Sequence, residues 1–253
     1  MRNDWHHAEG LWKSVRKTFR PFSCSALFVD DASPPPQQEE ARRLAGWNPK
    51  HVRVLFQEKH QGIPGCLNTA LEGLDREISL IVSADMKFQN PFLPWFILYA
   101  MVLRRADLFF FKCRHVDAAD GHTTAITGWS SCRGIQKEEG RLERFLDGSM
   151  RPSGYAVAFR TSVLKKYRYD PSLGPKCDSY LNNLMVLKHR SFYWGKVGVR
   201  TLERPGSFSR GLDQAGHEKI LSRILAKLGN DGIRLNEEQQ RRFLETERSA
   251  FPG

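Results

Sequence analysis

The stretch Ala26-Leu27-Phe28-Val29-Asp30-Asp31-Ala32-Ser33 changes from apolar to acidic side chains at the point where a buried strand would end. The stretch Ile78-Ser79-Leu80-Ile81-Val82-Ser83-Ala84-Asp85 repeats this pattern further along the chain. Carboxylates at the carboxyl ends of parallel strands point into the crevice where open α/β sheets bind ligands. There they can hold a sugar hydroxyl, the edge of a base or a divalent cation. The two stretches therefore predict an α/β protein with a nucleotide site.

Strands and helices alternate around these two stretches. Apolar runs predict further strands over 52–56 and 108–112, and helical patterns fall between the strands. This alternation over residues 1–115 predicts a doubly wound, mainly parallel sheet flanked by helices. Runs that are apolar throughout are typical of strands buried on both faces.

The second half of the sequence has weaker patterns. Residues 117–148 are polar and contain glycine, which predicts an irregular excursion from the sheet. From Asp213 onward the pattern is helical. We therefore expect one α/β domain over residues 1–210 and a helical C-terminal extension over residues 211–253.

The composition favours anionic partners. The chain has 253 residues with 39 Lys and Arg against 28 Asp and Glu, a net charge of +11. Such a balance attracts nucleotides, phospholipid headgroups, acidic glycans or nucleic acid. The basic residues accompany no nucleic-acid recognition motif, so we expect no specific nucleic-acid binding.

Cysteine usage and hydropathy indicate the compartment. The five cysteines are widely spaced, which argues against a disulfide or zinc framework and for a reducing environment. The longest apolar stretch, 92–103, contains Pro94 and is shorter than the roughly 18 residues that a bilayer span needs. We expect a cytoplasmic protein that can contact the inner face of the membrane peripherally through its basic residues.

An ordered series of motifs resembles the family 2 glycosyltransferases, which are inverting enzymes of the GT-A fold. The series begins with Asp30-Asp31-Ala32-Ser33, where the family has a strand ending in Asp-Asp-Gly-Ser. It continues with Gln57-Glu58-Lys59-His60-Gln61-Gly62 and with Asn68 in the following helix. The DxD-type motif corresponds to Ser83-Ala84-Asp85, and the family's later acidic pair corresponds to Cys177-Asp178.

This resemblance implies a role for each matched residue. Asp85 would lie on the metal side, with Mg²⁺ or Mn²⁺ as the divalent cation. Asp30 or Asp31 would hold the nucleoside, and Asp178 would be the general base that takes the acceptor proton. Asn68 and Ser83 would complete the site for the donor. The residues that we expect to bind the nucleotide sugar are Asp30, Asp31, Asn68, Ser83 and Asp85.

The resemblance also implies the reaction. The donor would be a nucleotide-diphosphate sugar, and the acceptor would be a glycan or a lipid-linked molecule of the cell envelope. The processive-synthase motif Gln-x-x-Arg-Trp is absent from the sequence, which favours transfer of a single sugar.

The sequence departs from the family pattern in three places. The family's first apolar strand has no counterpart, since the chain opens at Met1-Arg2-Asn3. Ser83 replaces the first acid of the DxD-type motif, and Cys177 replaces the acid before Asp178. These departures favour an alternative, a catalytically impaired relative that binds a nucleotide or a glycan.

Structural interpretations of the same residues remain open. Asp30-Asp31-Ala32-Ser33 is also typical of an exposed strand exit, because Asp and Ser favour turns. Asp178 directly precedes a helical pattern and is also a good helix cap. The stretch Gly62-Ile63-Pro64-Gly65 does not match the GxGxxG pattern of dinucleotide-dependent dehydrogenases.

Overall fold

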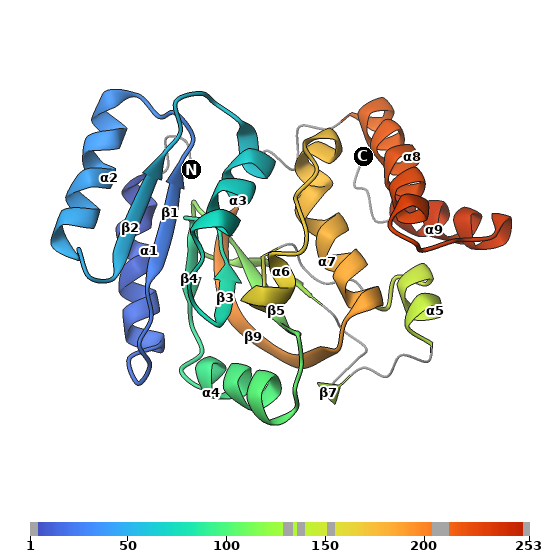
Figure 1. The fold of residues 1–253 in the computed structure, drawn as a ribbon, viewed down its shortest axis with the longest axis horizontal. Coiled ribbons are helices and arrows are strands. Elements are labelled where there is room, and N and C mark those ends of the chain that lie inside the picture. Colours follow the sequence, from blue (N-terminus) through green and yellow to red (C-terminus); the bar gives the residue numbers. More distant parts are fainter. Residues whose placement is uncertain (1–4, 129–133, 136–139, 151–154, 204–212, 250–253) are drawn as a thin grey trace.

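The computed structural model is an α/β protein in which helices flank a curled sheet, so the predicted fold class is confirmed. It describes residues 5–128, 134–135, 140–150, 155–203 and 213–249. A small N-terminal unit with two strands lies beside a larger sheet, and the last two helices lie at the opposite end of the molecule (Figure 1).

The N-terminal unit contains two strands and three helices. They are α1 (Trp5–Thr18), β1 (Ala26–Asp30), α2 (Pro35–Trp47), β2 (Val52–Phe56) and α3 (Gly62–Gly73). β1 and β2 pair in parallel, with Ala26 opposite Val52 and Asp30 opposite Phe56. α2 begins with proline because the first helical position needs no intrahelical N–H donor.

The larger sheet mixes parallel and antiparallel strands. Its members are β3 (Ile78–Ile81), β4 (Met86–Phe88), β5 (Leu108–Asp117), β6 (Thr123–Thr127), β7 (Gly134–Ile135), β8 (Val157–Arg160) and β9 (Ser191–Glu203). The strand order is β3-β8-β5-β9-β4, with β6 paired to β5 and β7 paired to β9. β5 and β9 are parallel, and the other pairs of this sheet are antiparallel. The sheet is thus less parallel than the sequence suggests, because β8 runs back between β3 and β5 and the short β5–β6 connection permits only antiparallel pairing.

The remaining helices surround this sheet. They are α4 (Leu93–Leu98), its π-helical continuation η1 (Tyr99–Leu103), α5 (Arg141–Leu146), α6 (Thr161–Leu164), the 3₁₀ segment η2 (Pro171–Lys176), α7 (Cys177–Lys188), α8 (Gln214–Asn230) and α9 (Glu237–Ser249). Leu221 of α8 and Phe243 of α9 belong to the same hydrophobic core as Leu184 of α7. The predicted domain boundary at residues 210–211 lies outside the described residues and stays a prediction.

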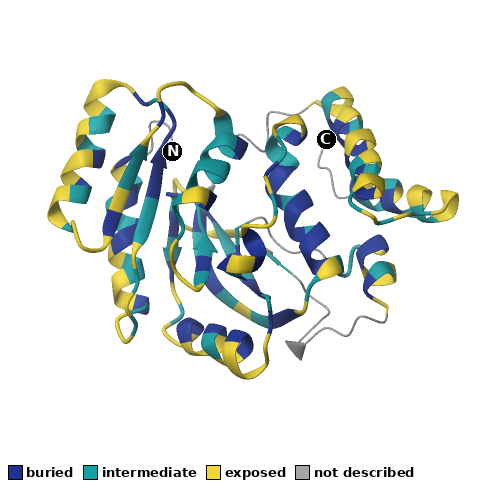
Figure 2. Cartoon of the chain, viewed as in Figure 1, coloured by how far each residue is buried: buried dark blue, intermediate teal, exposed yellow. Residues whose placement is uncertain are grey.

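The side chains of β5 alternate between two hydrophobic cores. Leu108 and Phe110 pack into the core beneath α7, whereas Phe109 and Phe111 pack into the core that includes α1 and α4. All four side chains are buried. Figure 2 shows the contrast in burial between elements, since α7 in the middle of the molecule is largely buried whereas α9 is mostly exposed. The alternation along β5 has the period of two that is typical of a strand. The apolar run therefore marks a strand covered on both faces, as predicted.

Residues 117–148 contain more regular structure than the composition predicts, so the expectation of an irregular excursion was wrong. β6 forms an antiparallel pair with β5, and Gly121 in the turn between them has a φ of 76°. α5 places Phe145 and Leu146 in the core. The side chains of β6 are mostly exposed, so the strand leaves little apolar signal in the sequence.

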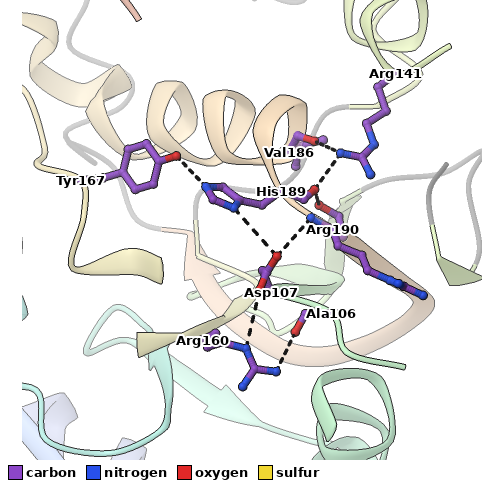
Figure 3. Close-up of polar contacts among 9 residues, drawn as sticks. Ala106, Asp107, Arg141, Arg160, Tyr167, Val186, His189 and Arg190 are labelled. Atoms are coloured by element: carbon purple, nitrogen blue, oxygen red, sulfur yellow. Dashed lines mark hydrogen bonds and ion pairs between the residues drawn. The ribbon is translucent and has the colours of Figure 1, made fainter. Parts of the chain in front are cut away.

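A polar network lies at the start of β5 (Figure 3). Arg160 Nε lies 3.6 Å from Asp107 Oδ1, and the backbone N–H of Arg190 donates to Asp107 Oδ2 at 3.3 Å. His189 Nδ1 lies 3.9 Å from the same carboxylate, and its Nε2 lies 2.6 Å from Tyr167 Oη. Burial lowers the pKa of His189, which keeps the ring neutral at pH 7. β3 and β5 are both antiparallel to β8, so they run in the same direction. The network at the start of β5 therefore lies at the opposite end of the strands from the carboxyl end of β3.

Candidate active site

Asp30 ends β1 and is buried inside the N-terminal unit. Its Oδ1 accepts a hydrogen bond from Trp5 Nε1 at 2.7 Å, and its Oδ2 accepts one from the backbone N–H of Ser33 at 3.0 Å. The side chain is fully covered. These contacts hold α1 against β1 and shape the turn that follows the strand. The observed role of Asp30 is structural, and its role in nucleoside binding stays a prediction.

Asp31 binds the beginning of α3. Its Oδ1 accepts a hydrogen bond from the backbone N–H of Gln61 at 2.7 Å, and its Oδ2 accepts one from that of Gly62 at 3.0 Å. His60 Nδ1 lies 2.6 Å from Oδ2. Gly62 has a φ of 72°, which favours glycine. The unpaired N–H groups and the positive dipole end of a helix stabilise a carboxylate in this position. Asp31 thereby fixes the loop before α3 to the end of β1.

Asn68 connects α3 to the segment before η2. Its Nδ2 donates to the backbone oxygen of Tyr169 at 2.9 Å, and its Oδ1 accepts from the backbone N–H of Tyr169 at 2.8 Å. The whole amide group therefore contacts the protein. Asn68 positions Tyr169, and its contact with a donor stays a prediction.

Asp178 lies in the first turn of α7, beside two tyrosines. Burial raises the pKa of both Tyr155 and Tyr169, and the negative charge of Asp178 raises both further. The backbone N–H of Ser179 donates to Asp178 Oδ1 at 2.6 Å. Burial raises the pKa of Asp178, although the Ser179 N–H opposes this shift. The helix cap itself is Lys176, so the cap interpretation of Asp178 was wrong.

Ser83 and Asp85 occupy the turn between β3 and β4. The backbone N–H of Met86 donates to the backbone carbonyl oxygen of Ser83 at 3.1 Å and closes the turn. The Asp85 side chain is half-buried. Burial and the nearby charge of Asp85 together raise the pKa of Cys113 to about 12. Burial and the charges of Asp178 and Cys177 raise the pKa of Tyr155 most, and the charge of Asp85 adds a smaller contribution in the same direction.

Two of the predicted acids therefore act on the same phenol. The charges of Asp178 and Asp85 both raise the pKa of Tyr155, although these acids are far apart in the sequence. Asn68 joins this group indirectly by holding the backbone of Tyr169. The group of Tyr155, Asp178 and Asp85 is the candidate active site. Asp31 binds the first turn of α3, and α3 in turn carries Asn68, so Asp31 is connected to the candidate active site through this helix.

The sequence reasoning missed Tyr155 and Tyr169. Tyr155 directly precedes the apolar run of β8, where an aromatic residue resembles ordinary core. Tyr169 is buried and has no motif spacing to mark it. Only the pairing of phenols with a buried carboxylate identifies them, and this pairing requires the fold.

The residues of the candidate site fit a cation that arrives with a substrate. Among the described residues, no group of three or more His, Cys, Asp or Glu side chains is arranged to hold a metal ion. Asp85 nevertheless offers carboxylate oxygen, which Mg²⁺ and Mn²⁺ prefer. Mg²⁺ is often bound by one or two protein carboxylates together with water and substrate phosphates. A single carboxylate such as Asp85 would therefore hold a cation together with substrate phosphates.

We expect Asn68→Ala to lower the free energy of unfolding by about 1–3 kcal/mol, because it leaves the backbone N–H and C=O of Tyr169 without their partner. Urea unfolding followed by circular dichroism would measure the change. Asn48→Ala is the matched control, since Asn48 makes only one long hydrogen bond, of 3.4 Å, to Leu44. Equal unfolding midpoints for the two variants would contradict the role of Asn68.

Solved structures share this fold along nearly the whole chain. Residues 1–349 of TarS from S. aureus align with a TM-score of 0.71 and 15% identity, covering 98% of this chain and 70% of that one. TarS 1–349 in complex with UDP aligns with a TM-score of 0.68 and 14% identity, covering 97% and 68%. The mannosyltransferase PcManGT from Pyrobaculum calidifontis, in complex with GDP-Man and Mn²⁺, aligns with a TM-score of 0.59 and 14% identity, covering 98% and 66%. No protein-family model and no curated protein matches the chain. The chain therefore has the GT-A-like fold of these glycosyltransferase structures.

Proposed function

We propose that this protein is a glycosyltransferase that moves a single sugar from a nucleotide-diphosphate donor to an acceptor hydroxyl, with inversion at the anomeric carbon. The observation that carries the proposal is that the charges of Asp85 and Asp178 both act on the same buried phenol, Tyr155, together with the GT-A-like fold. Binding of UDP by TarS and of GDP-Man by PcManGT, two proteins of the same fold, supports the choice of donor.

Asp178 is the proposed general base. Its carboxylate accepts the proton of the acceptor hydroxyl while the acceptor oxygen forms a bond to the anomeric carbon. The bond between that carbon and the diphosphate oxygen breaks, and the nucleoside diphosphate leaves with the bonding electrons. A single displacement of this kind inverts the configuration. The raised pKa of Asp178 suits the role, because a base is most effective when its pKa lies near the working pH.

Asp85 is the proposed ligand on the metal side, with Ser83 next to the ribose and Asp31 on the nucleoside side. Mn²⁺ in the PcManGT complex supports a divalent cation. When bound, such a cation would neutralise charge on the departing diphosphate. Asp85, which lies in the turn between β3 and β4, would hold the cation through its carboxylate.

Family 2 membership without the family's first strand is part of the proposal. Among the strands that the structure describes, β1 pairs only with β2, and β3 lies at the end of the larger sheet next to β8. Within the described residues, no strand bridges β1 and β3. This break is what we expect of a family 2 sheet that lacks a central strand. The acceptor in this proposal is a glycan or a lipid-linked molecule.

Donor binding and product release test the proposal together. The purified chain should show a higher Tm with UDP or GDP in the presence of Mn²⁺ than with EDTA, because a ligand that binds only the folded state stabilises it. Incubation with UDP- and GDP-sugars should release the nucleoside diphosphate. Absence of both effects across the common donors would overturn the proposal.

A second candidate is a relative that binds the donor without transferring the sugar. Burial raises the pKa of the Cys177 thiol to about 12, so this residue cannot replace the acid that normally accompanies the base. The same experiment separates the candidates. A rise in Tm without release of nucleoside diphosphate, in the presence of a panel of glycan acceptors, would favour the binding protein.

A further inference from the structure

The helix formed by α4 and η1 is apolar on both its buried and its exposed face. Leu93, Ile97, Ala100 and Met101 point into the core. The opposite face, here called the α4 face, consists of Phe92, Trp95, Phe96, Tyr99, Val102 and Leu103, which are 64%, 54%, 38%, 38%, 59% and 72% exposed. An apolar helix is normally covered on all sides. The apolar side chains of the α4 face are therefore exposed to water in the described structure, where an apolar helix would normally be packed against a partner.

This exposed apolar surface is concentrated in one place. Of the nine large hydrophobic side chains that are exposed in the described part of the chain, six belong to the α4 face, and the other three are Trp47, Phe56 and Ile126. The partly buried rings of Phe22 and Trp194 extend the face, since they pack on Trp95 and Phe96 with ring centroids 4.8 Å apart in each pair. Contiguous patches of this kind mark sites of protein or membrane contact.

Basic residues border the α4 face. Arg104 and Arg105 follow its last residue and are exposed, and Arg104 donates to the Tyr99 hydroxyl at 3.0 Å. Arg20 and Lys196 are exposed and lie two residues from Phe22 and Trp194, respectively. The segments that form and border the face contain no Asp or Glu; these segments are 10–29, 86–106 and 179–202. The exposed charged residues named here as flanking the face are thus all basic.

We propose that the α4 face binds the surface of an anionic lipid bilayer, with the helix lying in the plane of the interface. A protein partner would need an apolar groove bordered by acidic residues. An anionic bilayer has a negatively charged headgroup surface above an apolar acyl-chain layer, and it can accommodate a face of any size. Aromatic rings favour the headgroup region, and flanking arginines are attracted to anionic headgroups. No helix among the described residues has the length and hydropathy to span a bilayer, so contact is made by insertion of one face.

The position of the face leaves the candidate active site open. The helix leads directly into the start of β5. This start lies at one end of the strands, and the carboxyl end of β3, followed by Asp85, lies at the other end. In Figure 1, α4 forms the lower border of the molecule. Binding through the α4 face therefore does not depend on the proposed transfer reaction, and the two can be tested separately.

Sedimentation with vesicles tests the proposal. The wild-type chain should sediment with vesicles that contain about 30 mol% phosphatidylglycerol and not with pure phosphatidylcholine vesicles. Its tryptophan emission should shift to shorter wavelength on binding. The double variant Trp95→Ser/Leu103→Ser should bind at least about tenfold more weakly, because it removes apolar insertion. Arg104→Gln/Arg105→Asn should also lose about tenfold or more; Asn is chosen because Arg105 has a φ of 52°, which Asn tolerates.

Trp47→Ser is the matched control, since Trp47 is 60% exposed but lies on α2 and does not belong to the α4 face; its ring is covered by Arg43, 5.2 Å from the ring centroid. It should bind the vesicles like wild type. All variants should unfold at the wild-type temperature, because the substituted side chains are exposed. Failure of the wild-type chain to bind either vesicle, or equal binding by Trp95→Ser/Leu103→Ser and Trp47→Ser, would overturn the proposal. The proposal would also be overturned if the wild-type chain formed a concentration-dependent dimer that Trp95→Ser/Leu103→Ser abolishes, because a second copy of the chain would then bind the α4 face.

Discussion

Asp178→Asn is expected to lower the rate of sugar transfer by about 10²- to 10⁴-fold, which is the usual contribution of a general base. The amide cannot accept the acceptor proton. Its oxygen can still accept the hydrogen bond from the backbone N–H of Ser179, so donor binding should be preserved. Release of nucleoside diphosphate would measure the rate, and the ligand-induced change in Tm would measure donor binding.

The pH dependence provides an independent check on Asp178. Only the ionised carboxylate accepts a proton, so the rate should decline as the pH falls through its pKa. Burial raises that pKa, and the decline should therefore begin at a higher pH than for an exposed carboxyl, whose pKa is about 3.9. A rate that is constant through the weakly acidic range would contradict the assignment.

The same substitution should stabilise the fold at neutral pH. A carboxyl whose pKa is raised by folding favours the folded state when it is protonated, and this contribution is lost as the pH rises through the folded-state pKa. At pH 7 the buried charge of Asp178 is therefore unfavourable, and Asn removes it. We expect Tm to rise by roughly 2–4 °C. Asp213→Asn is the control, since Asp213 caps α8 in an exposed position, and it should leave the transfer rate unchanged. A joint loss of activity and stability in Asp178→Asn would indicate a structural role.

Asp85→Asn is expected to lower transfer by about 10²-fold or more and to remove the response to Mn²⁺, because an amide is a much weaker ligand for a hard cation than a carboxylate. Nucleoside-diphosphate release should be measured across a Mn²⁺ titration. Binding of UDP or GDP in EDTA should change little, which separates loss of the cation from loss of the pocket.

Asp75→Asn is the matched control for Asp85. Asp75 is an exposed carboxylate in the α3–β3 connection and forms an ion pair with Arg53 at 3.2 Å. It should retain the Mn²⁺ response of the wild-type chain. If Asp75→Asn and Asp85→Asn respond equally to Mn²⁺, the metal-side assignment of Asp85 is wrong.

The sequence predicts the strands well because their apolar runs are short and end in polar residues. β2 has the predicted bounds of 52–56, and the apolar runs 26–29 and 78–82 each differ from the observed strands β1 and β3 by one residue at one end. The predictions were weaker where packing rather than pattern decides. β6 is exposed and carries no apolar alternation, and α5 is a short helix whose buried Phe145 and Leu146 have too few neighbours to give a period.

The positions of the three acids relative to the strands were predictable, but their contacts were not. Asp30 ends β1, Asp31 follows it and Asp85 follows β3, as the apolar runs indicate, whereas their roles in a site stay predictions. The atoms that their carboxylates contact come from distant segments, such as the indole of Trp5 on α1. Periodicity holds no information about such partners. For this reason the structural role of Asp30 and the position of Tyr155 next to Asp178 emerge only from the fold.

The break between the two sheets has a consequence for how the molecule opens. No ladder of backbone hydrogen bonds joins β1 and β2 to the other described strands, so packing and isolated contacts such as the Asn68–Tyr169 pair hold the parts together. Amide hydrogen exchange should therefore detect two cooperative units of unequal stability. Asp31 belongs to the first unit and Asp85 to the second. A ligand that contacts both Asp31 and Asp85 would link the two units. Its binding free energy would have to offset the conformational entropy lost when the units are held in one relative arrangement.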